Sequence, residues 1–94
     1  MIVDVQAIET SGHPIPGGAS AIYDVRAVVD GDAQTFRAAV YERAGVQWAD
    51  FIDDRYKHVF DMHRNLLPRL CRLVFDIHNR KGVKFPAYLD DDRT

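Results

Sequence analysis

The sequence predicts an α+β fold, in which an antiparallel meander of three or four strands carries two helices, or one helix kinked at Pro68, packed on one face. Three observations lead to this prediction. Two alternating segments meet at Asp30-Gly31, the hydrophobic period changes from two residues to 3.6 residues after Gly45, and the helical spacing continues past Pro68.

The N-terminal half predicts three strands. Apolar and polar side chains alternate in residues 2–9, which is typical of a half-buried strand. Residues 11–20 contain two prolines and three glycines and are expected to form a loop. Residues 21–29 and 32–42 alternate again, and Asp30-Gly31 between them accepts the positive φ angles of a tight type I′ turn. These two segments are therefore expected to form a β-hairpin.

A two-residue turn defines the register of this hairpin. Val25 then faces Phe36 on the apolar side, and Asp24 faces Arg37 on the other side as a pair of opposite charges. A shift by one residue would place Arg26 opposite Phe36 and would turn one strand inside out. The register is therefore predicted together with the hairpin.

Two helices are expected in the C-terminal half. Apolar residues fall on one helical face over residues 47–65, and the same spacing continues over residues 68–80. Because Pro68 lacks a backbone N–H and clashes with the preceding turn, it either kinks one long helix or opens a second helix. We expect two helices, the second of which stops at Gly82.

The end of the chain is expected to add little to the fold. Residues 83–89 predict a short edge strand, because Pro86 excludes a central position. Residues 1–89 are expected to form a single domain, followed by an acidic, frayed tail at 90–94. The predicted core comprises Val3, Val5, Tyr23, Val25, Phe36, Val40, Trp48, Phe51, Ile52, Tyr56, Val59, Phe60, Leu66, Leu70, Leu73 and Ile77.

Composition indicates a small cytoplasmic protein. The 94 residues carry a net charge of −2, and 47% of them are hydrophobic, as in ordinary globular proteins. No apolar run approaches the roughly 20 residues of a membrane-spanning helix, and the N-terminus lacks the basic start of a signal peptide. Cys71 is the one cysteine and cannot form an intramolecular disulfide or a thiolate zinc site. We expect neither a metal nor another cofactor.

The charges are distributed unevenly along the chain. Residues 1–54 carry nine acidic and three basic side chains, whereas residues 55–89 carry two acidic and eight basic ones. A basic surface of this kind can bind anions or nucleic acid, although Asp76 lies among the basic residues and pairs with them as on an ordinary solvated helix face. The candidate residues for this contact are Arg64, Arg69, Arg72, Arg80, Lys81 and Lys84.

No catalytic residue is predicted. Nucleophilic catalysis requires an activated side chain beside a base, and Cys71 has no base near it in the sequence. A small-molecule enzyme is the remotest alternative, and it would need a deep polar pocket around Arg55, Tyr56 and His63.

The second predicted helix favours self-association. Its apolar side chains extend beyond one stripe, because Cys71 and Phe75 widen the apolar face to roughly half of the circumference. One face of the sheet is already covered by the first predicted helix, so part of this surface is expected to meet another subunit. A symmetric homodimer is the common solution for so small a chain, and Cys71 and Phe75 are its predicted contact residues.

The hairpin with its V-x-G turn (Val29, Gly31), followed by a helix with the pattern F-x-x-H-R (Phe60, His63, Arg64), resembles a small uncharacterised bacterial family of unknown function. This resemblance implies no activity. The sequence as a whole predicts a non-catalytic cytoplasmic binding or regulatory protein that self-associates. Binding of nucleic acid or another anion through the basic half is the alternative.

Overall fold

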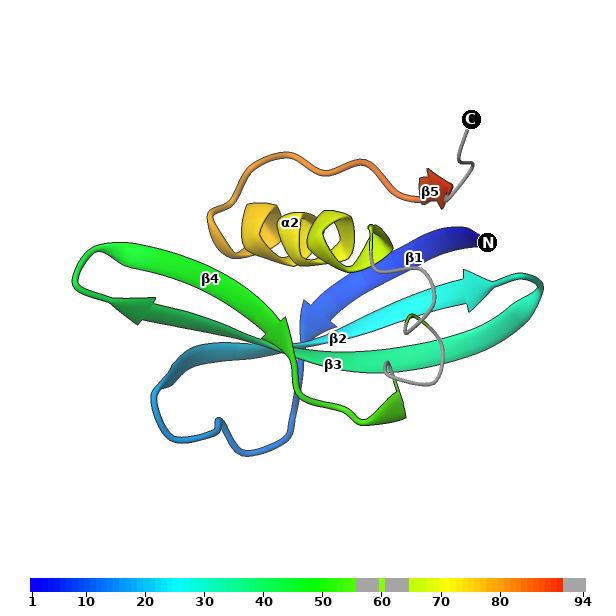
Figure 1. Cartoon of the computed structure of the whole chain (residues 1–94). Coiled ribbons are helices and arrows are strands. Elements are labelled where there is room, and N and C mark those ends of the chain that lie inside the picture. The colour runs from blue at the N-terminus through cyan, green and yellow to red at the C-terminus, as the bar shows by residue number, and fades with distance from the viewer. Residues whose placement is uncertain (56–59, 61–64, 91–94) are drawn as a thin grey trace.

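The structure, a computed structural model, describes residues 1–55, 60 and 65–90. Within these residues one antiparallel sheet has the strand order β4-β3-β2-β1-β5 and curls into a half-barrel (Figure 1). The helix α2 lies against the concave side of this sheet. The elements are β1 (Ile2–Thr10), β2 (Ala19–Val29), β3 (Asp32–Arg43), β4 (Val46–Phe51), α2 (Leu66–His78) and β5 (Ala87–Asp90).

The predicted β-hairpin is confirmed as β2 and β3. Asp30 and Gly31 have φ angles of 47° and 92° at the turn, as a type I′ turn requires. Val25 pairs with Phe36 and Asp24 with Arg37, as the two-residue loop predicted. The charge pair is present as well, since Arg37 Nε lies 3.8 Å from Asp24 Oδ1.

The predicted fold class is wrong, because the chain is mostly β and residues 47–51 are a strand where a helix was expected. Ala44 and Gly45 have φ angles of 53° and 81° and form a second tight turn. This turn returns the chain along β3 as β4, with Arg43 paired to Val46 and Ala38 to Phe51. Gly45 therefore marks a second hairpin and not a change to helical structure.

Two predicted core residues, Trp48 and Ile52, are partly exposed for the same reason. Side chains three residues apart share one face of a helix but point to opposite faces of a strand. Phe51 is buried, so Trp48 is directed away from the core and keeps 43% of its surface exposed, and Ile52 keeps 38%. Tyr56 and Val59, predicted from the same helical pattern, lie outside the described residues.

The helix α2 begins two residues before the predicted start and ends two residues before the predicted end. Pro68 lies in its first turn, where the missing N–H has no partner within the helix in any case. At the other end Arg80 has a φ of 59°, and Lys81 N donates to Asp76 O at 2.8 Å. Arg80 thus occupies the left-handed position that was expected to belong to Gly82.

The short strand β5 occupies the edge of the sheet beside β1, as predicted from Pro86. Val3 pairs with Leu89, and Ile2 pairs with Asp90. The last described residues therefore lie beside the first ones, as Figure 1 shows. Strand β5 is one edge of the sheet, and β4 is the other edge.

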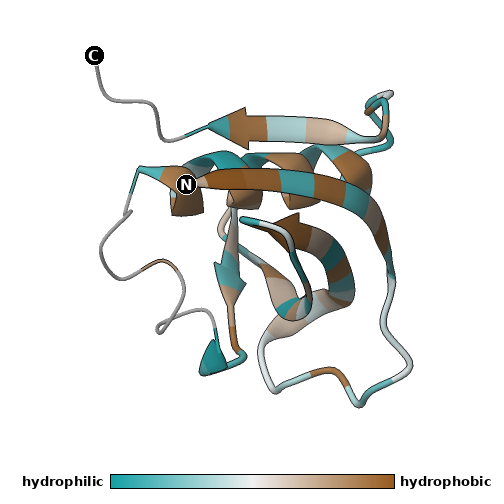
Figure 2. Cartoon of the chain, turned by 90° about the vertical axis from the view of Figure 1, so that its right-hand side faces the viewer, coloured by the Kyte–Doolittle hydropathy of each residue, from teal (hydrophilic) through white to brown (hydrophobic). Residues whose placement is uncertain are grey.

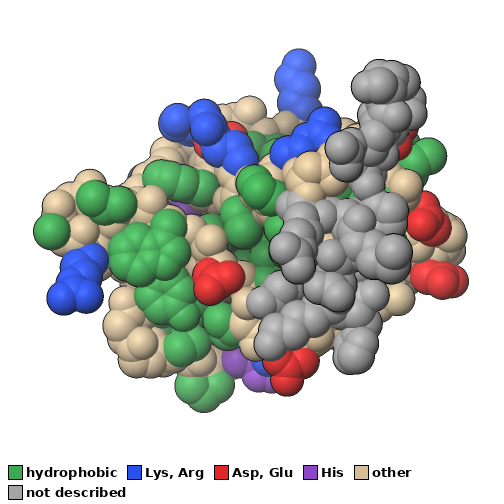
Figure 3. All heavy atoms as spheres, in the orientation of Figure 1, with side chains coloured by type: hydrophobic (Ala, Val, Ile, Leu, Met, Phe, Trp, Pro, Cys, Tyr) green, Lys and Arg blue, Asp and Glu red, His purple; other side chains and the backbone are tan. Residues whose placement is uncertain are grey.

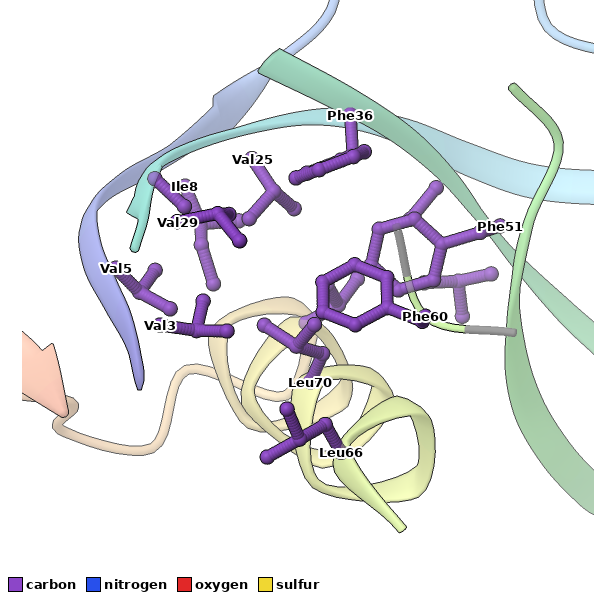
Figure 4. Close-up of a cluster of buried hydrophobic side chains, with 14 residues drawn as sticks. Val3, Val5, Ile8, Val25, Val29, Phe36, Phe51, Phe60, Leu66 and Leu70 are labelled. Atoms are coloured by element: carbon purple, nitrogen blue, oxygen red, sulfur yellow. The ribbon is translucent and has the colours of Figure 1, made fainter. Parts of the chain in front are cut away.

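The core lies between the concave side of the sheet and α2 (Figure 4). Hydrophobic segments of α2 and the strands adjoin there, as Figure 2 shows. Phe36 is at the centre, with Phe60 5.3 Å and Phe51 6.2 Å from it between ring centroids. Ile8 and Val74 join the core without having been predicted. The predicted core residues confirmed as buried are Val3, Val5, Val25, Phe36, Val40, Phe51, Phe60, Leu66 and Leu70, while Tyr23, Leu73 and Ile77 are partly buried against them.

Candidate interface at the edge of the sheet

Strand β4 directs part of its backbone away from the sheet. In an antiparallel hairpin, the pair that flanks a two-residue turn is hydrogen-bonded, and every second pair along the ladder is hydrogen-bonded as well. Here Arg43 and Val46 flank the turn. The bond from Ile52 N to Arg37 O, at 3.0 Å, follows the same alternation.

This alternation identifies the backbone groups that point outward. Val46, Trp48 and Asp50 direct their N–H and C=O groups toward β3. Gln47 and Ala49 direct theirs away from the sheet, where no further strand follows among the residues that the structure describes. Alternating donors and acceptors of this kind are a template for another strand.

The convex side of the β3–β4 hairpin carries an apolar surface with a stacked aromatic pair. The rings of Tyr41 and Trp48 lie 5.5 Å apart at an interplanar angle of 15°. Val46 is on the same side of β4 as Trp48 and is 62% exposed. Figure 3 shows hydrophobic side chains gathered over this hairpin. We call Tyr41, Val46 and Trp48 the hairpin patch.

Two opposite charges lie on the same side of the hairpin, at either end of the hairpin patch. Arg43 pairs with Val46 beside the turn, and Asp50 is two residues after Trp48. Both residues are exposed. When a second copy of such a surface is turned by 180° against the first, its cation meets the anion of the first copy and the two apolar centres meet.

Strand β4 lacks three of the features that protect an edge strand, namely proline, lysine and a bulge, while the helix α2 contacts it. Proteins commonly protect a sheet edge with proline, lysine, a bulge or a very short strand. Strand β4 contains neither proline nor lysine, and its pairing with β3 has no register shift. The opposite edge, β5, has four residues and directly follows Pro86. The two edges thus differ in their readiness to bind another strand.

The predicted basic residues are placed on and after α2, apart from Arg64, which lies outside the described residues. Arg69 Nη1 donates to Asp90 O at 2.9 Å, and Arg72 Nε lies 3.2 Å from Asp76 Oδ1. Arg80, Lys81 and Lys84 are exposed in the segment that follows the helix. Two of the candidate anion contacts are therefore engaged within the chain.

The predicted contact residues of the dimer, Cys71 and Phe75, are half-buried on α2. Cys71 packs against the core. Burial, together with the negative charge of Asp50, raises the pKa of the Cys71 thiol to about 11. Cys71 is thus close enough to β4 for Asp50 to act on it, and at neutral pH it is a protonated thiol and not an activated nucleophile.

A polar contact also joins β2 to the end of α2. The Tyr23 hydroxyl and His78 Nδ1 lie 2.8 Å apart, and the two rings meet edge to face. Burial raises the pKa of the Tyr23 hydroxyl. No local pattern could have indicated this contact, because β2 and the end of α2 meet only in the folded chain.

The candidate enzyme site cannot be assembled from the described residues. Tyr56 and His63 lie outside them, and Arg55 is exposed. The part of the chain that the structure describes contains no group of three His, Cys, Asp or Glu side chains placed to hold a metal ion. Within the same residues, no helix is long and apolar enough to cross a membrane.

Comparison with family models, curated proteins and solved structures gives no significant match to this chain. The sequence does not predict the candidate interface at β4, because the apolar spacing of residues 47–51 also fits a helix. The signal that could have indicated it is Ala44-Gly45, which follows an alternating strand in the same way as Asp30-Gly31 does.

Proposed function

We propose that this protein is a non-catalytic binding protein that associates with itself. The observation that carries the proposal is the edge of β4, where outward backbone groups at Gln47 and Ala49 adjoin the exposed apolar surface of Val46 and Trp48. Tryptophan is enriched among the residues that anchor protein interfaces, since it contributes a large contact area at a low cost in conformational entropy.

The state of the thiol supports a binding role over nucleophilic catalysis. A catalytic cysteine has a lowered pKa in an electropositive surrounding. Burial and the carboxylate of Asp50 act on Cys71 in the opposite direction. The side chain therefore serves packing beside β4.

The oligomeric state tests the proposal. Light scattering coupled to size exclusion should give a mass of twice 10.7 kDa at high micromolar concentration and a lower mass on dilution. A mass of 10.7 kDa at every concentration would contradict self-association.

The basic residues of α2 and the segment after it provide the second candidate, binding of nucleic acid. Their gathering at one side of the molecule is visible in Figure 3. A protein that contacts phosphates in this way would bind a labelled oligonucleotide at low salt and release it as salt is raised, because phosphate contacts release counterions. We expect no salt-dependent binding, because Arg69 donates to the backbone oxygen of Asp90 and Arg72 pairs with the carboxylate of Asp76. A steep salt dependence would favour this second candidate.

A further inference from the structure

We infer that two copies of this chain pair edge to edge through β4, antiparallel about a two-fold axis, with Trp48 of one copy opposite Trp48 of the other. This inference rests on the proposed self-association and specifies its surface and register. It follows from three properties of the strand, namely which backbone groups point outward, which side chains share a row, and where the charges lie.

The outward backbone groups restrict the possible registers. Of the four central residues of β4, Gln47 and Ala49 direct their backbone groups outward, because Trp48 and Asp50 bond to β3. Two-fold pairing with Trp48 at the centre sets Gln47 of one copy opposite Ala49 of the other. Both are outward-facing residues, so each of the two symmetric pairs forms two N–H···O bonds. The four outward N–H and C=O groups of Gln47 and Ala49 in each copy are thereby satisfied.

The side chains on the convex side match in this register. Trp48 faces Trp48 of the second copy at a position without hydrogen bonds, where opposed Cα atoms are about 4.5 Å apart. Since Tyr41 already stacks on Trp48 at 5.5 Å, the pairing continues one aromatic row across four strands, from one Tyr41 to the other. Aromatic cross-strand pairs are among the favourable contacts of antiparallel sheets.

The charges complete the match. Asp50 of the second copy faces Val46, and Val46 itself pairs with Arg43 on β3. Arg43 of the first copy and Asp50 of the second are thus two strand spacings apart, which is about 10 Å between their Cα atoms. An arginine side chain extends over a valine across that distance, so two symmetric Arg43–Asp50 pairs flank the aromatic row. Neither neighbouring register keeps Asp50 of one copy opposite Val46 of the other. Moving the two-fold axis one residue toward Phe51 places Asp50 opposite Trp48, and moving it one residue the other way places Asp50 opposite Ala44 in the turn.

The second copy fits this edge better than an unrelated strand does, because the arrangement of cation, apolar centre and anion is complementary to itself. Strand β5 offers no such arrangement, since it has four residues and follows Pro86. The pairing would join two half-barrel sheets into one continuous sheet through β4.

Light scattering of two charged variants tests which edge is used. Trp48→Lys places two like charges opposite each other and should weaken dimerisation by about a hundredfold or more. Tyr88→Lys is the matched control, because Tyr88 is an exposed aromatic residue on the β5 edge. It should leave the dimer intact, as should Phe75→Asp on α2. Dissociation by Phe75→Asp but not by Trp48→Lys would overturn the inference and would leave self-association through the helix.

Disulfide trapping in a Cys71→Ser background tests the register. Opposed Cα atoms at about 4.5 Å are within the range that a disulfide spans. Under copper phenanthroline and oxygen, which accept the two electrons and two protons of the paired thiols, Trp48→Cys should link to itself. A mixture of Val46→Cys and Asp50→Cys should form the mixed dimer while retaining Trp48, and each of these two variants alone should stay unlinked.

The outcomes separate the inference from the proposed function. A dimer in which Trp48→Cys links to Val46→Cys or to Asp50→Cys would overturn the register and leave self-association in place. A dimer that none of these cysteines traps would overturn the β4 edge as the interface. A monomer at every concentration would overturn both the register and the proposed function.

Discussion

Replacing Phe36 by alanine should destabilise the protein far more than replacing Trp48 by alanine, although both residues are large aromatics on neighbouring strands. Phe36 is fully buried, and its ring contacts those of Phe51 and Phe60. Trp48 is 43% exposed and stacks on one ring, that of Tyr41. The comparison tests whether residues 46–51 are a strand, since a helix over the same residues would place Trp48 in the core.

The expected magnitudes follow from burial. Truncating a fully buried phenylalanine to alanine costs about 3–5 kcal/mol through lost transfer free energy and the cavity left behind. At Trp48 roughly half of the side chain is already in water, and the stacked pair adds about 0.5–1.5 kcal/mol, so the expected loss is about 1–2 kcal/mol. A domain of 94 residues has a free energy of unfolding of roughly 5–14 kcal/mol, so Phe36→Ala removes a large part of it.

Urea unfolding followed by far-UV circular dichroism measures both losses. Fluorescence is unsuitable because Trp48 is the one tryptophan of the chain. The titrations should be repeated at several protein concentrations, since dimerisation adds a concentration-dependent contribution to stability. A loss at Trp48 equal to or larger than that at Phe36, at the lowest concentration, would refute the strand assignment and the exposure of Trp48.

Two further predictions concern the second hairpin turn and the thiol. Ala44→Asn should raise the free energy of unfolding by about 0.5–1 kcal/mol, because the φ of 53° is costly for alanine and asparagine tolerates it in a type I′ turn. Thermal unfolding measures this gain, and Ala44→Val should lower the midpoint; equal midpoints for both variants would contradict the turn assignment. Alkylation of Cys71 by iodoacetamide in the folded protein should accelerate as pH rises toward 11, whereas the unfolded chain should titrate near 9.0. Since the pKa of the thiol is higher in the folded protein than in the unfolded chain, the protonated thiol stabilises the fold below pH 9, and this contribution is lost as pH rises through 11. An alkylation rate of the folded protein with its midpoint near pH 9 would contradict the burial of Cys71.

Part of this fold was predictable because its determinants are local. The alternation of residues 21–42 and the turn at Asp30-Gly31 specify both the hairpin and the pairing of Val25 with Phe36. Pro86 restricts the last strand to an edge, where β5 is found. In each case a few neighbouring residues exclude the competing structure on steric or hydrogen-bonding grounds.

Residues 46–51 show where local information was insufficient. Trp48, Phe51 and Ile52 satisfy a helical period, and in so short a segment this period cannot be distinguished from a strand by pattern alone. Pairing with residues 38–43 of β3 decides for the strand, because it satisfies the backbone of β4 on one side and buries Phe51.

The sequence by itself determined the first hairpin, its register, the presence of a helix after Pro68 and most of the core. The tertiary structure decided which side chains remain exposed and which described strands form the two edges of the sheet. Trp48 is exposed because β4 directs it away from the core, and the sheet order places β4 and β5 outermost. The contact of Tyr23 with His78 likewise exists only because α2 packs across the concave side of the sheet. Such properties belong to the arrangement of distant segments, which no local period encodes.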